Sequence, residues 1–94
     1  MKRVTLITGA SRGIGAATAR LCAADGHAVA INYRSDAEAA ERVRTEIESA
    51  GGTGIAVQGD TGIEADILRM FETVDQALGT VTGLVNNAGI HGPR

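Results

Sequence analysis

The chain has 94 residues and a formal net charge of −2 at pH 7, a length that provides for one domain at most. Hydrophobic residues make up 44% and charged residues 21%, a balance typical of folded globular proteins and not of disordered ones. The weakly acidic charge and the scarcity of aromatic residues, with one Tyr, one Phe and no Trp, argue against a nucleic-acid partner.

The chain also gives no sign of a membrane or metal partner. Its apolar runs are interrupted within a few residues, so no membrane span is predicted. The sequence Met1-Lys2-Arg3 leads directly into a strand-like run instead of a signal-peptide core, and we expect a cytoplasmic protein. The single cysteine, Cys22, has no second cysteine with which to form a disulfide or a CxxC zinc pattern, and no metal site is predicted.

Four short apolar runs predict β-strands, at residues 4–7, 28–31, 55–57 and 84–85. The first run is rich in β-branched residues and stops at a glycine two positions later. Because the runs are almost continuously apolar and do not alternate with polar residues, they favour strands that are covered on both faces, as in a parallel sheet.

The segments between these strands have helical periodicity. The clearest apolar stripes have spacings of three and four residues; they comprise Ala40, Val43, Ile47 and Ala50 in the second helical segment, and Ile67, Met70, Phe71, Val74 and Leu78 in the third. Ser35 with Glu38, and Thr61 with Glu64, fit capping boxes at helix starts. Three glycines lie where the helices are expected to end; these are Gly26, Gly51 and Gly79. The alternation of strand and helix predicts a doubly wound α/β fold.

A glycine-rich turn, TGASRGIG at residues 8–15, joins the first strand to the first helix. A bound phosphate needs backbone N–H donors and a close approach, so such a turn lacks side chains where the backbone meets the pyrophosphate, and the helix that follows points its free N–H groups at the anion. In this interpretation Gly9 allows the sharp turn, Gly13 allows close passage over the pyrophosphate, and Gly15 lets the helix pack tightly.

The spacing TGxxxGxG resembles that of the classical short-chain dehydrogenase/reductase family. Two further motifs support the resemblance: Asn86-Asn87-Ala88-Gly89, which is similar to the NNAG of the family, and Asp60-Thr61 after the third strand. The resemblance implies that the NNAG segment steadies the sheet and borders the cofactor, and that Asp60 hydrogen-bonds the adenine amino group. On the residues alone, Asp60 starting a turn and the asparagine pair capping a strand remain alternatives.

The resemblance covers nearly the whole chain and implies a Rossmann-type doubly wound parallel sheet with strand order 3-2-1-4. Residues 1–94 would then form an NAD(P)-binding Rossmann domain that is the N-terminal portion of a longer one. The expected cofactor-binding residues in the glycine turn are Gly9, Ser11, Arg12, Gly13, Ile14 and Gly15. Those elsewhere are Tyr33, Arg34, Ser35, Asp60, Thr61, Asn86, Asn87, Ala88 and Gly89.

The residues at the end of the second strand indicate which nicotinamide dinucleotide is preferred. An acid about 20 residues after the glycines would bind the ribose 2′-hydroxyl of NAD, but Tyr33 stands there and Arg34 follows it. A guanidinium suits a 2′-phosphate, and Arg12 resembles the second basic residue of NADP-preferring members of the family. We therefore expect NADP(H) to be preferred, with NAD(H) possible. The alternatives for Arg34 are a solvated surface charge or a partner for Asp36.

No catalytic residue is predicted within the chain. The resemblance implies a catalytic Ser and a Tyr-x-x-x-Lys pair beyond the NNAG segment, and the only tyrosine, Tyr33, is followed four residues later by Ala37. The first hypothesis is the cofactor portion of an oxidoreductase that interconverts a small-molecule carbonyl and a secondary alcohol, similar to 3-oxoacyl-carrier-protein reductases and glucose dehydrogenases. The second is a non-catalytic dinucleotide-binding or interaction module. A homotetramer is implied by the resemblance alone.

Overall fold

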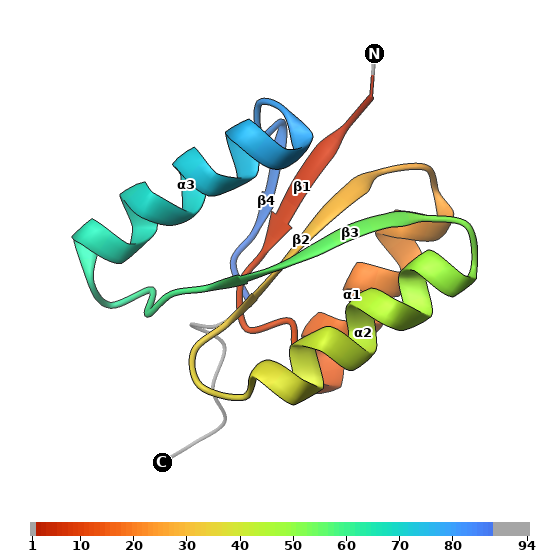
Figure 1. Cartoon of the computed structure of the whole chain (residues 1–94), viewed down its shortest axis with the longest axis horizontal. Helices are drawn as coiled ribbons and strands as arrows, with labels where there is room; N and C mark the ends of the chain where they lie inside the picture. The colour runs from red at the N-terminus through yellow and green to blue at the C-terminus, as the bar shows by residue number, and fades with distance from the viewer. Residues whose placement is uncertain (1, 88–94) are drawn as a thin grey trace.

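The computed structural model of the chain describes residues 2–87 and shows strands and helices in strict alternation (Figure 1). The elements are β1 (Val4–Ile7), α1 (Gly13–Ala24), β2 (Ala28–Tyr33), α2 (Ala37–Ser49), β3 (Thr53–Gln58), α3 (Glu64–Leu78) and β4 (Gly83–Val85). The four strands are all parallel and lie in the order β3-β2-β1-β4, which confirms the predicted α/β fold and strand order. No helix described between residues 2 and 87 has both the length and the apolar character that crossing a membrane requires.

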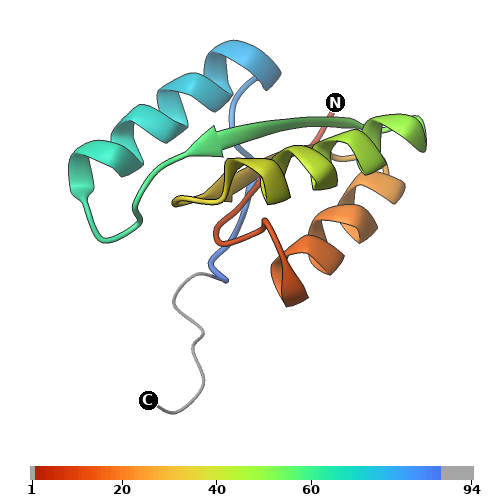
Figure 2. The same cartoon turned by 60° about the horizontal axis from the view of Figure 1, so that its bottom comes forward.

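The helices cover both faces of the sheet, with α3 on one side and α1 and α2 on the other (Figures 1 and 2). Alternate strand residues supply the two cores, because successive side chains of a strand point to opposite faces. Ile7, Val29 and Ile31 pack beneath α1 and α2, whereas Leu6 and Ala30 pack beneath α3. Both faces of β1 and β2 are therefore buried, as the continuous apolar runs predict.

Strand β2 extends beyond β1 at the carboxyl edge of the sheet. The pairing of β1 with β2 ends at Ile7 opposite Ile31, whereas β2 continues beside β3 through Asn32 and Tyr33. The predicted strand, residues 28–31, is two residues too short because the apolar run stops at Asn32. Asn32 is nevertheless only 2% exposed, and its side chain belongs to the site described below.

The helix starts differ from the predicted capping boxes. Asp36, not Ser35, is the N-cap of α2, and its carboxylate accepts a 3.0 Å hydrogen bond from the backbone N–H of Ala39. Helix α3 begins after Ile63 without a side-chain cap, so Thr61 lies in the preceding loop. Aspartate and serine cap helices about equally well, so the sequence offers two adjacent caps and the fold uses the second.

The helix ends and apolar stripes follow the sequence prediction closely. Gly26, Gly51 and Gly79 have positive φ angles of 91°, 91° and 110°, the backbone conformation that favours glycine after a helix. In α2 the predicted stripe is buried except for Ala50, which is exposed because it lies past the helix end. In α3 Met70 and Val74 are fully buried, and the other three predicted residues pack against the same core.

Candidate cofactor site

The carboxyl ends of the four strands lie along one edge of the sheet, where the loops carrying the predicted site residues meet. These loops are the glycine turn after β1, the β2–α2 connection, the β3–α3 connection and residues 86–87 after β4. In open α/β sheets, ligands bind at this edge. The parallel topology therefore gathers motifs that lie up to 78 positions apart in the chain.

The glycine turn has the backbone geometry that a phosphate site requires. Gly9 and Gly13 have φ angles of 60° and 64°, a conformation that other residues rarely adopt. The space around the Cα of Gly13 is open, because a Cβ placed there would meet no atom within 4 Å. At Gly15, by contrast, a Cβ would lie 2.5 Å from the carbonyl oxygen of Gly9, so this glycine lets α1 close onto the turn.

The N-terminus of α1 is available to an anion. Arg12 is its N-cap and makes no capping hydrogen bond with its side chain, and the first turn contains no acidic residue. The leading N–H groups of the helix therefore face outward with the positive end of the helix dipole. Ile14, which follows in the first turn, is 75% exposed. This arrangement fits a pyrophosphate.

The segment after β4 is hydrogen-bonded to the glycine turn. Asn87 donates a 3.1 Å hydrogen bond from Nδ2 to the carbonyl oxygen of Gly9. Thr8 donates its backbone N–H to the carbonyl oxygen of Val85 over 3.0 Å, and its hydroxyl donates to Oδ1 of Asn86 over 3.2 Å. The first two residues of the NNAG motif thus contact the turn, whereas Ala88 and Gly89 lie outside the described residues.

The sequence interpretation missed Asn32, whose side chain is hydrogen-bonded to the glycine turn. Its Oδ1 accepts a 3.1 Å hydrogen bond from the N–H of Gly9, and its Nδ2 donates to the carbonyl oxygen of Gly59 over 3.1 Å. Its backbone carbonyl accepts from Ala10 over 2.9 Å. One signal points to it: a polar residue that continues an apolar strand is often buried with its hydrogen bonds satisfied.

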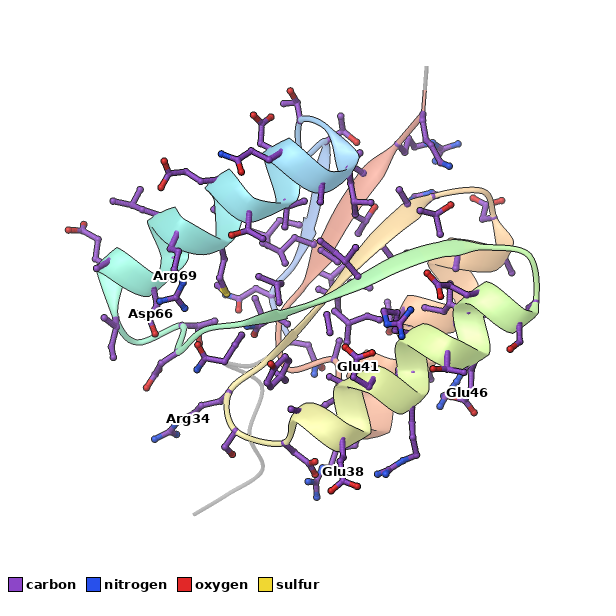
Figure 3. All side chains as sticks on the ribbon, viewed as in Figure 1. Arg34, Glu38, Glu41, Glu46, Asp66 and Arg69 are labelled. Atoms are coloured by element: carbon purple, nitrogen blue, oxygen red, sulfur yellow. The ribbon has the colours of Figure 1, made fainter. Side chains whose placement is uncertain are left out.

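Two ion pairs, both absent from the sequence interpretation, occupy the far end of the site. Nε of Arg34 lies 3.5 Å from Oδ2 of Asp60, and Arg12 pairs with Asp36. The alternative that Arg34 pairs with Asp36 is therefore wrong. Figure 3 shows the Arg34 side chain directed away from the sheet, and 79% of it is exposed. Both predicted phosphate-binding arginines thus have a carboxylate neighbour but remain largely open to solvent.

Asp36 is held in its ionised form. The pKa of its carboxyl lies below the ordinary value because the backbone N–H of Ala39 donates to it, and the guanidinium of Arg12 acts in the same direction. The carboxylate thus joins the start of α2 to the glycine turn. Ser35, predicted to contact the cofactor, lies exposed immediately before it.

Asp60 and Thr61 open the loop between β3 and α3. Oδ1 of Asp60 accepts a 2.8 Å hydrogen bond from the N–H of Gly62, and its own N–H donates to Asp66 over 2.9 Å. Thr61 lies with Thr8 and Asn86 at the rim of a hollow of about 290 Å³. The rest of this hollow is apolar, lined by Leu6, Ile67, Met70, Phe71 and Leu84.

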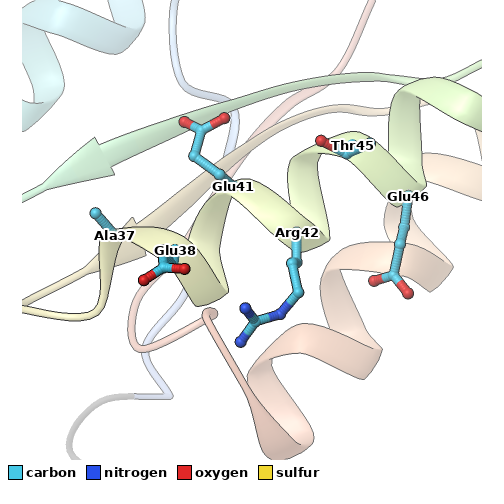
Figure 4. A pocket seen from close by; sticks show the side chains of 6 residues that line it. All are labelled: Ala37, Glu38, Glu41, Arg42, Thr45 and Glu46. Carbon is cyan, nitrogen blue, oxygen red and sulfur yellow. The ribbon is translucent and has the colours of Figure 1, made fainter.

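Further hollows lie along α2. A polar groove of about 450 Å³ between α1 and α2 starts at Ser11 and Arg12 and reaches Arg42. A larger hollow of about 510 Å³ lies on the outer side of α2 (Figure 4), but every residue lining it belongs to that one helix. It therefore lacks the converging loops of the carboxyl edge. Within residues 2–87, no cluster of His, Cys, Asp and Glu is suited to hold a metal ion.

Comparison with known proteins places this architecture in a family. The model of the short chain dehydrogenase family matches residues 3–94. The uncharacterized oxidoreductase YgfF of Escherichia coli is 45% identical over 87 residues, which make up 93% of this chain and 35% of that protein. The chain spans about a third of the length of the curated relatives that it matches.

Solved structures agree with this comparison. A variant of a short-chain dehydrogenase/reductase from Serratia marcescens superimposes with a TM-score of 0.90 at 36% identity, over 96% of this chain and 37% of that one. The promiscuous reductase LugOII, which catalyses keto-reduction at C1 during lugdunomycin biosynthesis, superimposes with a TM-score of 0.84 at 36% identity, over 95% of this chain and 38% of that one. The chain therefore belongs to the short-chain dehydrogenase family.

Proposed function

We propose that this chain is the NADP(H)-binding portion of an oxidoreductase that interconverts a carbonyl and a secondary alcohol by hydride transfer. One observation carries the proposal: a glycine turn that is hydrogen-bonded to Asn32 and Asn87 presents the uncapped N-terminus of α1 at the carboxyl edge of the sheet. Membership of the dehydrogenase family supports it.

The pyrophosphate would bind over the glycine turn. Gly13 leaves the space for it, since a Cβ there would meet nothing within 4 Å, and the free N–H groups at the start of α1 supply the donors. Gly9 and Gly15 shape the turn, and Ser11 adds a hydroxyl at its half-buried tip. The residues present therefore fit a diphosphate.

The adenosine end would bind between the loops after β2 and β3. Arg12 and Arg34 carry exposed guanidinium groups, which suit the dianionic 2′-phosphate of NADP. Tyr33 and Ser35 flank Arg34, and Asp60 with Thr61 would face the adenine. No carboxylate stands at position 33 to hold a bare 2′-hydroxyl, which favours NADP(H) while leaving NAD(H) acceptable.

The nicotinamide end would lie beside Ile14 and the NNAG segment, Asn86 to Gly89. When bound, the dinucleotide supplies the hydride; the residues of this chain bind and orient it. We assign no catalytic residue within residues 1–94. A carbonyl as the substrate class is supported by LugOII, whose keto-reduction is the property of that protein.

Calorimetric titration of the purified protein with NADPH and with NADH tests the proposal. We expect both to bind, NADPH the more tightly. The 94-residue chain alone should reduce no carbonyl compound, and turnover by a preparation of verified mass would contradict this. If the protein binds neither NADPH nor NADH, the proposal is wrong. If mass spectrometry of the intact natural protein gives the mass of a 94-residue chain, the alternative of a non-catalytic binding module is favoured.

A further inference from the structure

The buried amide of Asn32 lies between the two halves of the proposed dinucleotide site. On one side its Oδ1 accepts from the N–H of Gly9 over 3.1 Å. On the other its Nδ2 lies within hydrogen-bonding distance of the carbonyl oxygens of Val57, at 3.3 Å, and Gly59, at 3.1 Å. The side chain thus spans from the glycine turn to the end of β3.

An amide satisfies both sides of this arrangement. The N–H of Gly9 requires an acceptor, whereas the two carbonyl oxygens require donors, and an asparagine side chain offers both at one position. Sδ of Met70 lies a further 3.0 Å from Nδ2. Because Asn32 is 2% exposed, bulk water does not reach it, and a mismatched group there costs the desolvation of an unsatisfied polar atom.

The backbone around Asn32 reinforces the connection. Its carbonyl oxygen accepts from Ala10 over 2.9 Å, and the carbonyl oxygen of Tyr33 accepts from Gly59 over 3.0 Å. Gly59 directly precedes Asp60, the proposed adenine contact. These hydrogen bonds therefore join the end of β3, through Asn32, to the glycine turn.

We propose that Asn32 is a positioning residue that fixes the spacing between the pyrophosphate turn and the adenosine loop. Its side chain acts through Gly9 on one side and Gly59 on the other, without touching the dinucleotide. This inference rests on the proposed function. In this proposal the Asn32 side chain holds the two subsites in place before the dinucleotide binds. Less conformational entropy is then lost on binding.

The variant Asn32→Asp tests this through a pH profile. A protonated carboxyl donates to a carbonyl and accepts from Gly9, whereas the carboxylate keeps the Gly9 hydrogen bond and repels the carbonyl oxygens of Val57 and Gly59. The groups around Asn32 named above are peptide groups and a thioether, none of which titrates. We expect the dissociation constant for NADPH, divided by that of the unaltered protein at each pH, to rise about tenfold between about pH 5 and pH 8.

The matched control is Gln58→Glu, which makes the same amide-to-acid change on β3. Gln58 is exposed, and its side chain donates to the carbonyl oxygen of Arg34 over 3.0 Å without entering the Asn32 network. For Gln58→Glu, the dissociation constant for NADPH divided by that of the unaltered protein should not change over the same pH range. An exposed glutamate is ionised across that range. The ratio also removes the titration of the 2′-phosphate, which all the proteins share.

A second variant covers the case in which Asn32→Asp does not fold at high pH. Asn32→Val suits a strand but offers no acceptor to the N–H of Gly9, so we expect faster amide hydrogen exchange at Gly9 and about tenfold weaker NADPH binding. A folded Asn32→Asp variant with a flat ratio, or unchanged binding in Asn32→Val, would overturn this inference alone. An unaltered protein that binds neither NADPH nor NADH would overturn the proposed function and this inference with it.

Discussion

The side-chain amide of Asn87 donates a 3.1 Å hydrogen bond to the carbonyl oxygen of Gly9 across 78 positions of sequence. The same Nδ2 atom would lie 2.7 Å from a Cβ placed on Gly15. Asn87 after β4, the turn after β1 and the first turn of α1 therefore pack as one unit without room for a methyl group at position 15. The close packing explains why glycine stands at position 15.

Gly15→Ala should destabilise the fold and distort the turn. The new Cβ would lie 2.5 Å from the carbonyl oxygen of Gly9 and 2.9 Å from the Cα of Ala10, and both of these atoms belong to the backbone, which yields little. We expect a loss of about 1–3 kcal/mol in the free energy of unfolding, measured by urea denaturation. An unfolding free energy equal to that of the unaltered protein would contradict the packing described here.

Gly13→Ala and Gly26→Ala form a matched pair. Both glycines have positive φ, at 64° and 91°, and both face open space. Each alanine should therefore cost a similar backbone strain of about 1–2 kcal/mol. Only Gly13 lies where the pyrophosphate is proposed to pass, because Gly26 ends α1 at the opposite edge of the sheet.

Dinucleotide binding separates the two variants. We expect Gly13→Ala to weaken NADPH binding strongly and Gly26→Ala to leave it unchanged, since the added methyl group occupies ligand space in the first variant only. Calorimetry on both proteins, at a temperature where both are folded, provides the measurement. Equal affinities would mean that the turn does not hold the pyrophosphate.

Asp36 should make the stability of the fold depend on pH under acidic conditions. Its pKa in the folded protein is lowered from 3.8, first by the hydrogen bond from Ala39 and then by Arg12. A lowered folded pKa means that the contribution to stability is complete above the unfolded value and is lost as the pH falls through the folded value. Asp36→Ala should therefore lower the melting temperature at neutral pH, and the difference should shrink below about pH 4.

Asp36→Asn separates the cap from the ion pair. Asparagine retains an acceptor for the N–H of Ala39 but carries no charge for Arg12. Its melting temperature should lie between those of the alanine variant and the unaltered protein. If the melting temperatures of Asp36→Ala and the unaltered protein differ as much at pH 2 as at neutral pH, ionisation of Asp36 contributes nothing to stability.

Most of the fold could be predicted from local patterns. The apolar runs of β1 and β2 and the stripe of α2 report burial directly, and Gly26 and Gly51 mark helix ends through a backbone conformation that few other residues adopt. The parallel direction of the strands follows from the alternation of strand and helix, whereas the strand order 3-2-1-4 was implied by the family resemblance. The helix starts were harder, because Ser35 and Asp36 are both good caps and only the three-dimensional path of the chain decides between them.

The site was only partly predictable because its geometry depends on contacts between distant segments. The glycine turn is a local motif, and the sequence identifies it. The burial of Asn32, by contrast, follows from the register that sets β2 beside β3 and past the end of β1. The pairing of Arg34 with Asp60 likewise joins two loops, 26 positions apart, which only the sheet brings together.

Arg34→Asp should shift the cofactor preference from NADP toward NAD. In the unaltered protein Asp60 lies 3.5 Å from Nε of Arg34, so a bound 2′-phosphate competes with this carboxylate for the guanidinium. The substitution removes a charged donor and adds a carboxylate that repels the 2′-phosphate but accepts from a ribose 2′-hydroxyl. Loss of one charge-assisted hydrogen bond weakens NADP binding by about tenfold to a hundredfold.

The control for this prediction is Arg3→Asp, which makes the same charge change at an exposed position before β1, at the opposite edge of the sheet. Dissociation constants for NADPH and NADH should be measured at fixed salt, because exposed charges are screened. The ratio of the two constants should change in Arg34→Asp and stay constant in Arg3→Asp, since only position 34 faces the proposed phosphate site. If both variants shift the ratio equally, the effect is one of net charge; if neither does, Arg34 is a surface residue paired with Asp60 and no part of cofactor selection.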